Sequence, residues 1–93
     1  MAEKKYLLVN QSIVCREEEG GEALLFNPET GEIKVANSTA LFIWQLCDGT
    51  RTKADVLRAL EEEFEVGREV LEKDLDAFIE DLENQELISY VAR

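Results

Sequence analysis

The chain has 93 residues and a formal net charge of −11, from 21 acidic and 10 basic side chains. This length suits a single domain spanning 1–93, and a hydrophobic fraction of 45% is typical of folded rather than disordered chains. The excess of acids disfavours nucleic acids and anionic membranes as partners, because both attract proteins through Lys and Arg. It favours a basic partner, although acids that serve only solubility are the simpler interpretation.

The chain offers few groups for metal or disulfide chemistry. It has two cysteines, Cys15 and Cys47, and no histidine. We therefore expect no metal and no cofactor, and two reduced thiols in a cytoplasmic protein. No stretch approaches the roughly 18 apolar residues of a membrane span, and none has the pattern of a signal peptide.

The first part of the chain predicts β-structure. Residues 1–10 suggest a loosely held N-terminal arm, in which the apolar run at 6–9 could add a short edge strand or dock on the core. Residues 12–18 contain β-branched side chains and predict a strand. The glycine pair at 20–21 then predicts a turn.

A β-hairpin is predicted for residues 23–36. Its turn contains Pro28, which presets a backbone angle, and Gly31, which takes the left-handed conformation without strain. The second strand alternates polar and apolar side chains. This alternation predicts that Ile33 and Val35 face a core while the polar residues beside them face water.

The rest of the chain predicts three helices and a short final strand. Residues 37–49 have apolar side chains at three- and four-residue spacing around Trp44, with Asn37 and Ser38 as caps at the start. A second helix begins at a capping box formed by Thr52 and Asp55.

The third helix spans about 68–84, and residues 87–91 form an apolar, wing-like strand. Short connections make the three strands before the first helix antiparallel. The predicted fold is therefore α+β: a three-stranded antiparallel sheet followed by three helices, similar to a winged helix-turn-helix.

No catalytic arrangement is evident. There is no histidine to act as a base, Cys47 lies on an apolar helical face, and the acidic runs at 17–19 and 61–63 are typical of solvated surfaces. Ser38 is better explained as a helix cap than as the attachment site of a carrier-protein arm. The acidic third helix also excludes the DNA-binding use of a winged fold.

The edge of the predicted sheet is the candidate binding site. An extended peptide can pair with an open edge as a further strand. If the third helix lies beside that edge, a groove results, in which small side chains would admit a peptide backbone and acidic ones would pair with Lys or Arg. The candidate residues are Glu32, Ile33, Lys34, Val35, Ala36, Asn37, Val70, Asp74, Ala77 and Asp81. The helical members of this set fit the rim of the core equally well.

The chain resembles the PqqD-like family, also called the RiPP recognition element, over nearly its whole length after Ser12. The most specific piece is the Cys-Asp-Gly-Thr-Arg-Thr run at 47–52. The other matching residues are 25–27, 37–40, 43–46, Val66, Leu71, Asp74, Leu75, Phe78, Leu82 and Leu87. Most of these are core or turn positions, so they specify the fold well. The chain departs from the family at Glu86, where glycine is frequent.

The resemblance implies a fold of three strands and three helices without catalytic activity. It also implies binding of the leader of a ribosomally made precursor peptide for a modifying enzyme, often a radical SAM enzyme. The leader would pair with the strand at 32–37 and pack on the stripe that starts at Val70. The acidic hairpin leaves open whether the pathway makes the coenzyme PQQ or another peptide product.

The residues also leave open a second function class. A small dimerisation or regulatory domain would bury the same edge against another protein chain, without binding DNA. We expect a monomer or a weak homodimer.

Overall fold

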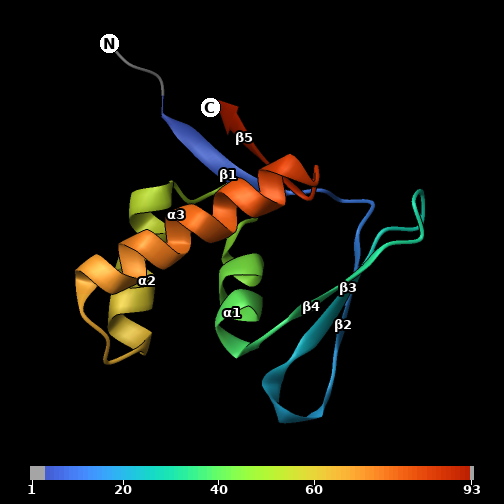
Figure 1. Cartoon of the computed structure of the whole chain (residues 1–93). Coiled ribbons are helices and arrows are strands. Elements are labelled where there is room, and N and C mark those ends of the chain that lie inside the picture. Colours follow the sequence, from blue (N-terminus) through green and yellow to red (C-terminus); the bar gives the residue numbers. More distant parts are fainter. Residues whose placement is uncertain (1–3, 93) are drawn as a thin grey trace.

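The computed structural model describes residues 4–92 and contains two antiparallel sheets and three helices (Figure 1). The larger sheet has the order β2 (Val14–Glu17), β3 (Ala23–Phe26) and β4 (Ile33–Ala36). The helices are α1 (Ser38–Leu46), α2 (Lys53–Glu63) and α3 (Arg68–Asn84). The smaller sheet pairs β1 (Lys5–Val9) with β5 (Ile88–Ala92), and a short 3-10 turn, Glu19–Gly21, joins β2 to β3. The predicted α+β fold with a three-stranded antiparallel sheet and three helices is confirmed.

The N-terminal segment is a core strand. Leu7 of β1 is completely buried, its N–H donates to the carbonyl of Arg51 at 2.9 Å, and its own carbonyl accepts from Gly49 at 2.8 Å. The prediction of a loosely held arm is therefore wrong for residues 5–9, which take the alternative of a strand docked on the core. Residues 1–3 of that predicted arm lie outside the described part of the chain.

The side chains of β4 point the opposite way from the prediction. Ile33 and Val35 are 62% and 64% exposed, so the expectation that they face the core is wrong. The reason lies in the neighbouring strand, where Leu25 is buried and pairs with Lys34. Facing residues share a side of the sheet, so Lys34 lies on the inner side with Leu25, and Ile33 shares the outer side with Phe26.

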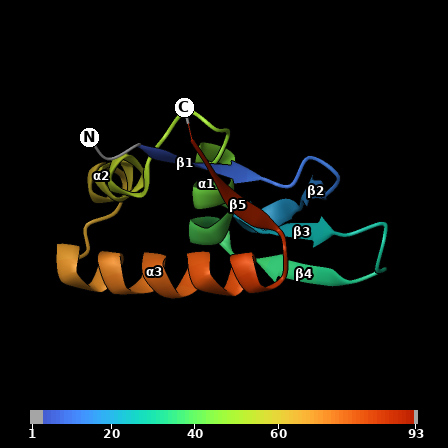
Figure 2. The ribbon, with the colours of Figure 1, turned by 90° about the horizontal axis from the view of Figure 1, so that it is seen from above.

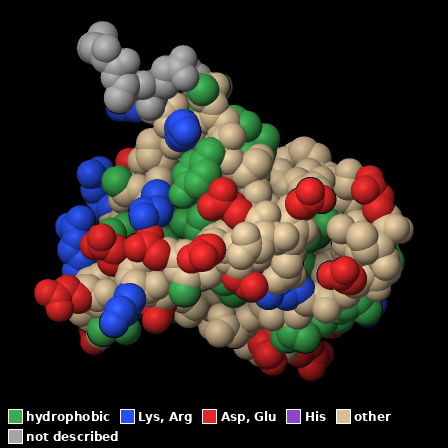
Figure 3. Space-filling view, turned by 45° about the horizontal axis from the view of Figure 1, so that its top comes forward, with side chains coloured by type: hydrophobic (Ala, Val, Ile, Leu, Met, Phe, Trp, Pro, Cys, Tyr) green, Lys and Arg blue, Asp and Glu red, His purple; other side chains and the backbone are tan. Residues whose placement is uncertain are grey.

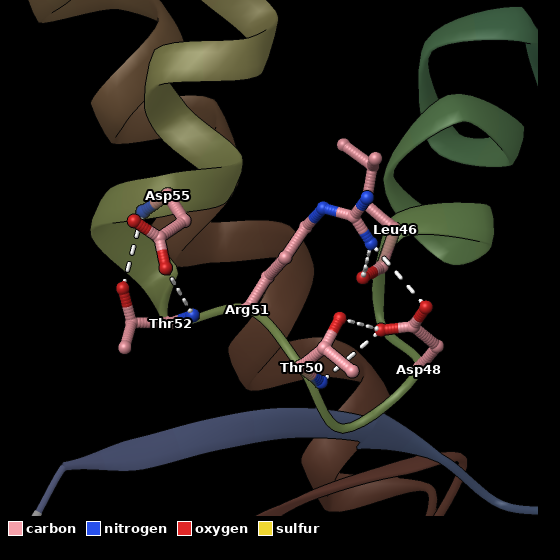
Figure 4. A network of polar contacts seen from close by, with 6 residues as sticks. All are labelled: Leu46, Asp48, Thr50, Arg51, Thr52 and Asp55. Atoms are coloured by element: carbon pink, nitrogen blue, oxygen red, sulfur yellow. Dashed lines mark hydrogen bonds and ion pairs between the residues drawn. The ribbon is translucent and has the colours of Figure 1, made fainter.

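The helices begin at the predicted caps. The Asn37 side chain accepts a hydrogen bond from the N–H of Ala40 at 2.8 Å and starts α1 directly after β4. Figure 4 shows the turn between α1 and α2, where Thr52 and Asp55 form the predicted capping box. The same turn is held by Arg51, which donates to the carbonyl of Leu46 at 3.3 Å. These hydrogen bonds satisfy backbone groups that a helix end leaves unpaired.

The core lies between the helices and the inner side of the larger sheet. Trp44 of α1 is 7% exposed, and Leu60, Leu75 and Leu82 of α2 and α3 are almost fully buried. Seen from above, β4 is the strand of the larger sheet on the side of α3 (Figure 2). The core thus fixes α1 and α3 next to one edge of the sheet.

We predict that Leu7→Ala lowers the free energy of unfolding by about 2–5 kcal/mol, because it leaves a cavity in the core. Urea denaturation followed by circular dichroism measures this change. Val14→Ala is the matched control: its side chain is 53% exposed, so the change should stay within about 0.5 kcal/mol. Equal effects of the two substitutions would mean that β1 is not part of the core in solution.

Candidate functional site

The outer edge of β4 carries unpaired backbone groups. Within residues 4–92, β4 pairs with β3 alone. The N–H of Asn27 donates to the carbonyl of Glu32 at 3.0 Å, so these facing residues form a hydrogen-bonded pair. Hydrogen-bonded and non-hydrogen-bonded pairs alternate along an antiparallel ladder. Lys34 therefore directs its backbone groups to β3, whereas Ile33 and Val35 direct their N–H and C=O groups to the open edge.

A groove of about 470 Å³ lies between this edge and α3, bordered by the first turns of α1. Its lining residues are Lys34, Val35 and Asn37 from β4 and its end, Thr39, Ala40 and Ile43 from α1, and Asp74, Ala77, Phe78 and Asp81 from α3. Apolar side chains from both helices are thus flanked by polar groups. A groove of this composition, next to unpaired backbone groups, suits an extended peptide.

The groove brings together a large part of the predicted site. The predicted residues that line it are Lys34, Val35, Asn37, Asp74, Ala77 and Asp81. The others lie elsewhere: Glu32 and Ile33 border a small neighbouring hollow, Ala36 is buried, and Val70 is 52% exposed one turn before Asp74.

The sequence reasoning missed the part of the groove that comes from α1, together with Phe78. The periodic apolar side chains of 37–49 indicate only a buried helical face, and Phe78 appears only among the family positions, most of which are core or turn positions. One signal was available for α1. Because Asn37 both ends the edge strand and caps the helix, the first turns of α1 must lie at the end of that edge.

An ion pair joins the two walls at one end of the groove. The Nζ atom of Lys34 lies 2.6 Å from Oδ2 of Asp81, and Gln85 donates to the other carboxylate oxygen at 2.9 Å. The hydrogen bond from Lys34 is the main reason why the pKa of Asp81 is lower than usual. Elsewhere in the groove, Asp74 has no ion-pair partner among residues 4–92.

The surface around the groove is strongly acidic. Figure 3 shows acidic side chains spread over the visible face, with basic side chains gathered mainly on one side. α3, which forms one wall of the groove, carries seven acidic and two basic side chains. Such a surface attracts cationic ligands and repels phosphates.

The candidate reactive groups of residues 4–92 are a metal-binding cluster and the buried cysteine. No group of three or more His, Cys, Asp or Glu side chains in residues 4–92 is placed to hold a metal ion. Cys47 is fully buried, and this burial raises the pKa of its thiol to about 12, so the reactive thiolate is not formed near neutral pH. In the same part of the chain, no helix combines the length and apolarity needed to cross a membrane.

The sequence matches a family model described as Coenzyme PQQ synthesis protein D (PqqD) over residues 22–88. A comparison with curated proteins finds no match. Two similar solved structures contain leader peptides: TbiB1 in complex with the TbiA(beta) leader peptide, and a lasso peptide synthetase B1 complexed with the leader peptide.

The TbiB1 chain is 24% identical with a TM-score of 0.78, and the match covers 88% of this chain and 94% of that one. The lasso synthetase chain is 28% identical with a TM-score of 0.73, and the match covers 89% of this chain and 96% of that one. The heterocyclase TruD is 14% identical with a TM-score of 0.67. That match covers 94% of this chain but 12% of TruD, so the fold recurs there within a much longer chain.

We predict that Lys34→Met raises the pKa of Asp81 toward its usual value. In the wild type, the lowered pKa of Asp81 stabilises the folded state at pH values above the pKa that Asp81 has in the unfolded chain. This contribution is lost as the pH falls through the folded-state pKa. A carboxyl NMR titration of Asp81 measures the shift. Lys53→Met is the matched control, because Lys53 pairs with Asp76 instead. An unchanged pKa of Asp81 in the Lys34→Met variant would show that the ion pair does not form.

Proposed function

The chain belongs to the PqqD family, and on this premise we propose that it is a non-catalytic adaptor for a ribosomally made precursor peptide. It binds the leader of that peptide and presents it to a modifying enzyme. The observation that carries the proposal is the groove beside the open edge of β4. The leader-bound lasso synthetase chain, 28% identical over 89% of this chain, supports the adaptor over a dimerisation or regulatory domain.

In this proposal the leader adds to the sheet as a strand beside β4. The outward N–H and C=O groups of Ile33 and Val35 pair with its backbone. Each such bond contributes only about 0.5–1.5 kcal/mol net, because a bond to water is lost when it forms. Main-chain pairing therefore gives modest affinity for any extended peptide, and the groove must supply selectivity.

The side chains of the groove indicate what kind of leader fits. In an extended peptide every second side chain points to the same side. Ala40, Ile43 and Phe78 offer an apolar surface to a leader side chain that enters the groove. Asp74, which lacks an ion-pair partner in the described chain, is placed for a Lys or Arg of the leader.

The length of the groove sets the length of the recognised segment. Asp74 and Asp81 are seven residues apart on α3, which corresponds to about 10 Å along a helix. About three residues of an extended chain span that distance. A short leader segment with one apolar and one basic anchor thus satisfies the groove. Radical SAM enzymes are one candidate class for the enzyme that receives the peptide.

We predict that Val35→Pro weakens leader binding about two- to tenfold, because proline removes one donor from the open edge. Calorimetric titration with synthetic leaders of short precursor genes adjacent to this gene measures the effect. Val35→Ala is the matched control, since it shortens the side chain but keeps the N–H. Equal affinities of the proline variant and the wild type would contradict strand addition. Failure of the wild type to bind these leaders would contradict the adaptor function.

We also predict that Ala77→Phe weakens leader binding by about 1.4 kcal/mol or more, which is roughly tenfold. Ala77 is exposed on α3 and lines the groove, so a phenyl ring there occupies space that the peptide needs. Ala54→Phe on α2 is the matched control, because Ala54 is also exposed on a helix but lies outside the groove. Undiminished binding by Ala77→Phe would place the leader elsewhere on the protein.

A further inference from the structure

The outer side of the β2–β3–β4 sheet is apolar and open to water. The strand register aligns Val14, Phe26 and Ile33 across the three strands, and their exposed fractions are 53%, 38% and 62%. Val35, at 64% exposed, and the half-buried Leu24 face each other in a second row. We call these five residues the outer sheet face.

This face gathers most of the exposed apolar bulk of the described chain. Among residues 4–92, the large hydrophobic side chains that are exposed are Val14, Phe26, Ile33, Val35, Val66 and Val70, and the first four lie on this face. An antiparallel sheet with one side in water usually carries polar side chains there. A contiguous exposed apolar patch with a polar surround is instead typical of an interaction surface.

Acidic turns border both ends of the outer sheet face. The turn between β2 and β3 carries Glu18, Glu19 and Glu22, and the turn between β3 and β4 carries Glu29 and Glu32. All five glutamates are exposed. Beside the outer sheet face, the same side of the sheet carries one basic residue of β2, Arg16, which is paired with Leu24. Arg16 lies 3.6 Å from Glu18 and is thereby partly neutralised.

This charge pattern selects among possible occupants. A second copy of the chain would bring its own acidic turns and a net charge of −11 against the first, and like charges facing each other oppose association. A protein surface with an apolar centre matches the apolar face, and Lys or Arg residues around that centre match the acidic turns. The outer sheet face therefore fits a different protein with a basic rim.

The outer sheet face and the peptide groove share β4. A leader that adds to the open edge of β4 extends the sheet by one strand. Alternate side chains of that strand then lie on the outer side, next to Ile33 and Val35. A protein docked on the outer sheet face would thus contact the bound leader as well as the adaptor.

We propose that the outer sheet face is the docking surface for the enzyme that receives the leader. It would bind an apolar patch flanked by Lys and Arg on that enzyme. This inference rests on the proposed function and adds the surface through which the peptide is handed over. Leader binding and enzyme docking then use two different sides of β4, its edge and its outer face.

The test uses the double variant Val14→Lys and Phe26→Lys. Both residues lie on strands away from the open edge of β4, so we expect the leader dissociation constant to change by less than about twofold. The probe is the purified enzyme that modifies the leader identified by the titration above. Biolayer interferometry measures its association with the leader-loaded adaptor. We expect the enzyme to bind the double variant at least about tenfold more weakly than the wild type, because a contact at the centre of an interface is lost.

Val66→Lys is the matched control, because Val66 is 47% exposed in the connection between α2 and α3, away from the outer sheet face. It should associate with the enzyme as the wild type does. If the double variant does not fold, Val14→Lys alone provides the same test, since Val14 lies on the outer strand β2 and is 53% exposed.

The outcomes separate this inference from the proposed function. The docking surface alone is overturned if the double variant binds both the leader and the enzyme as the wild type does. It is also overturned if Val66→Lys loses as much enzyme affinity as the double variant. A wild type that binds no leader overturns the proposed function and this inference with it. Wild-type dimerisation in sedimentation that the double variant abolishes assigns the face to a second copy and also overturns the inference.

Discussion

The pairing of β4 with β3 is the constraint on which the groove and the outer sheet face both depend. Leu25 is 2% exposed and pairs with Lys34, so the buried strand fixes which side chains of β4 turn inward. With Lys34 on the inner side, its ammonium group reaches Asp81 of α3. The same register leaves Ile33 and Val35 with outward side chains and with backbone groups at the open edge. A one-residue shift would exchange all of these roles at once.

The surrounding core keeps this edge strand and α3 in fixed positions. β4 passes into α1 at the Asn37 cap, and Trp44 anchors α1 in the core. On the other wall, Leu75 and Leu82 of α3 are completely buried, so the helix presents its groove side at a defined distance. A groove with walls set by the core loses little conformational entropy when it binds a peptide. The modest main-chain contribution to affinity is then retained.

Local sequence patterns predicted the elements but not the relations between distant segments. The bounds of α3, the Asn37 cap and the capping box of α2 follow from residues within one or two turns of each other. By contrast, β1 forms because residues 5–9 meet β5, more than 70 residues later in the chain, and no local signal carries that pairing. The side chains of β4 were assigned to the wrong side because hydrophobic Ile33 and Val35 suggest a buried face. Their true orientation depends on Leu25 in the next strand.

The candidate site shows the same division between local and distant information. Spacing along α3 predicts Val70, Asp74, Ala77 and Asp81 on one stripe, and all of these except Val70 line the groove. The contribution of Ala40 and Ile43 depends on how α1 crosses the end of the sheet, which side-chain periodicity does not encode. Periodicity identifies which residues of one element share a face. The three-dimensional packing decides which faces meet.

An open strand edge beside an exposed apolar face is a hazard as well as a proposed binding site, because identical copies can pair through both. The acidic turns at both ends of the sheet oppose that pairing. In a face-to-face stack of two copies with aligned strands, Glu18 and Glu22 at one end and Glu29 and Glu32 at the other would lie against acidic turns of the second copy. A leader with a basic anchor, or a partner with a basic rim, meets no such repulsion. Under the proposed function, the charge that at first suggests only solubility therefore also opposes self-pairing at β4 and favours a cationic partner.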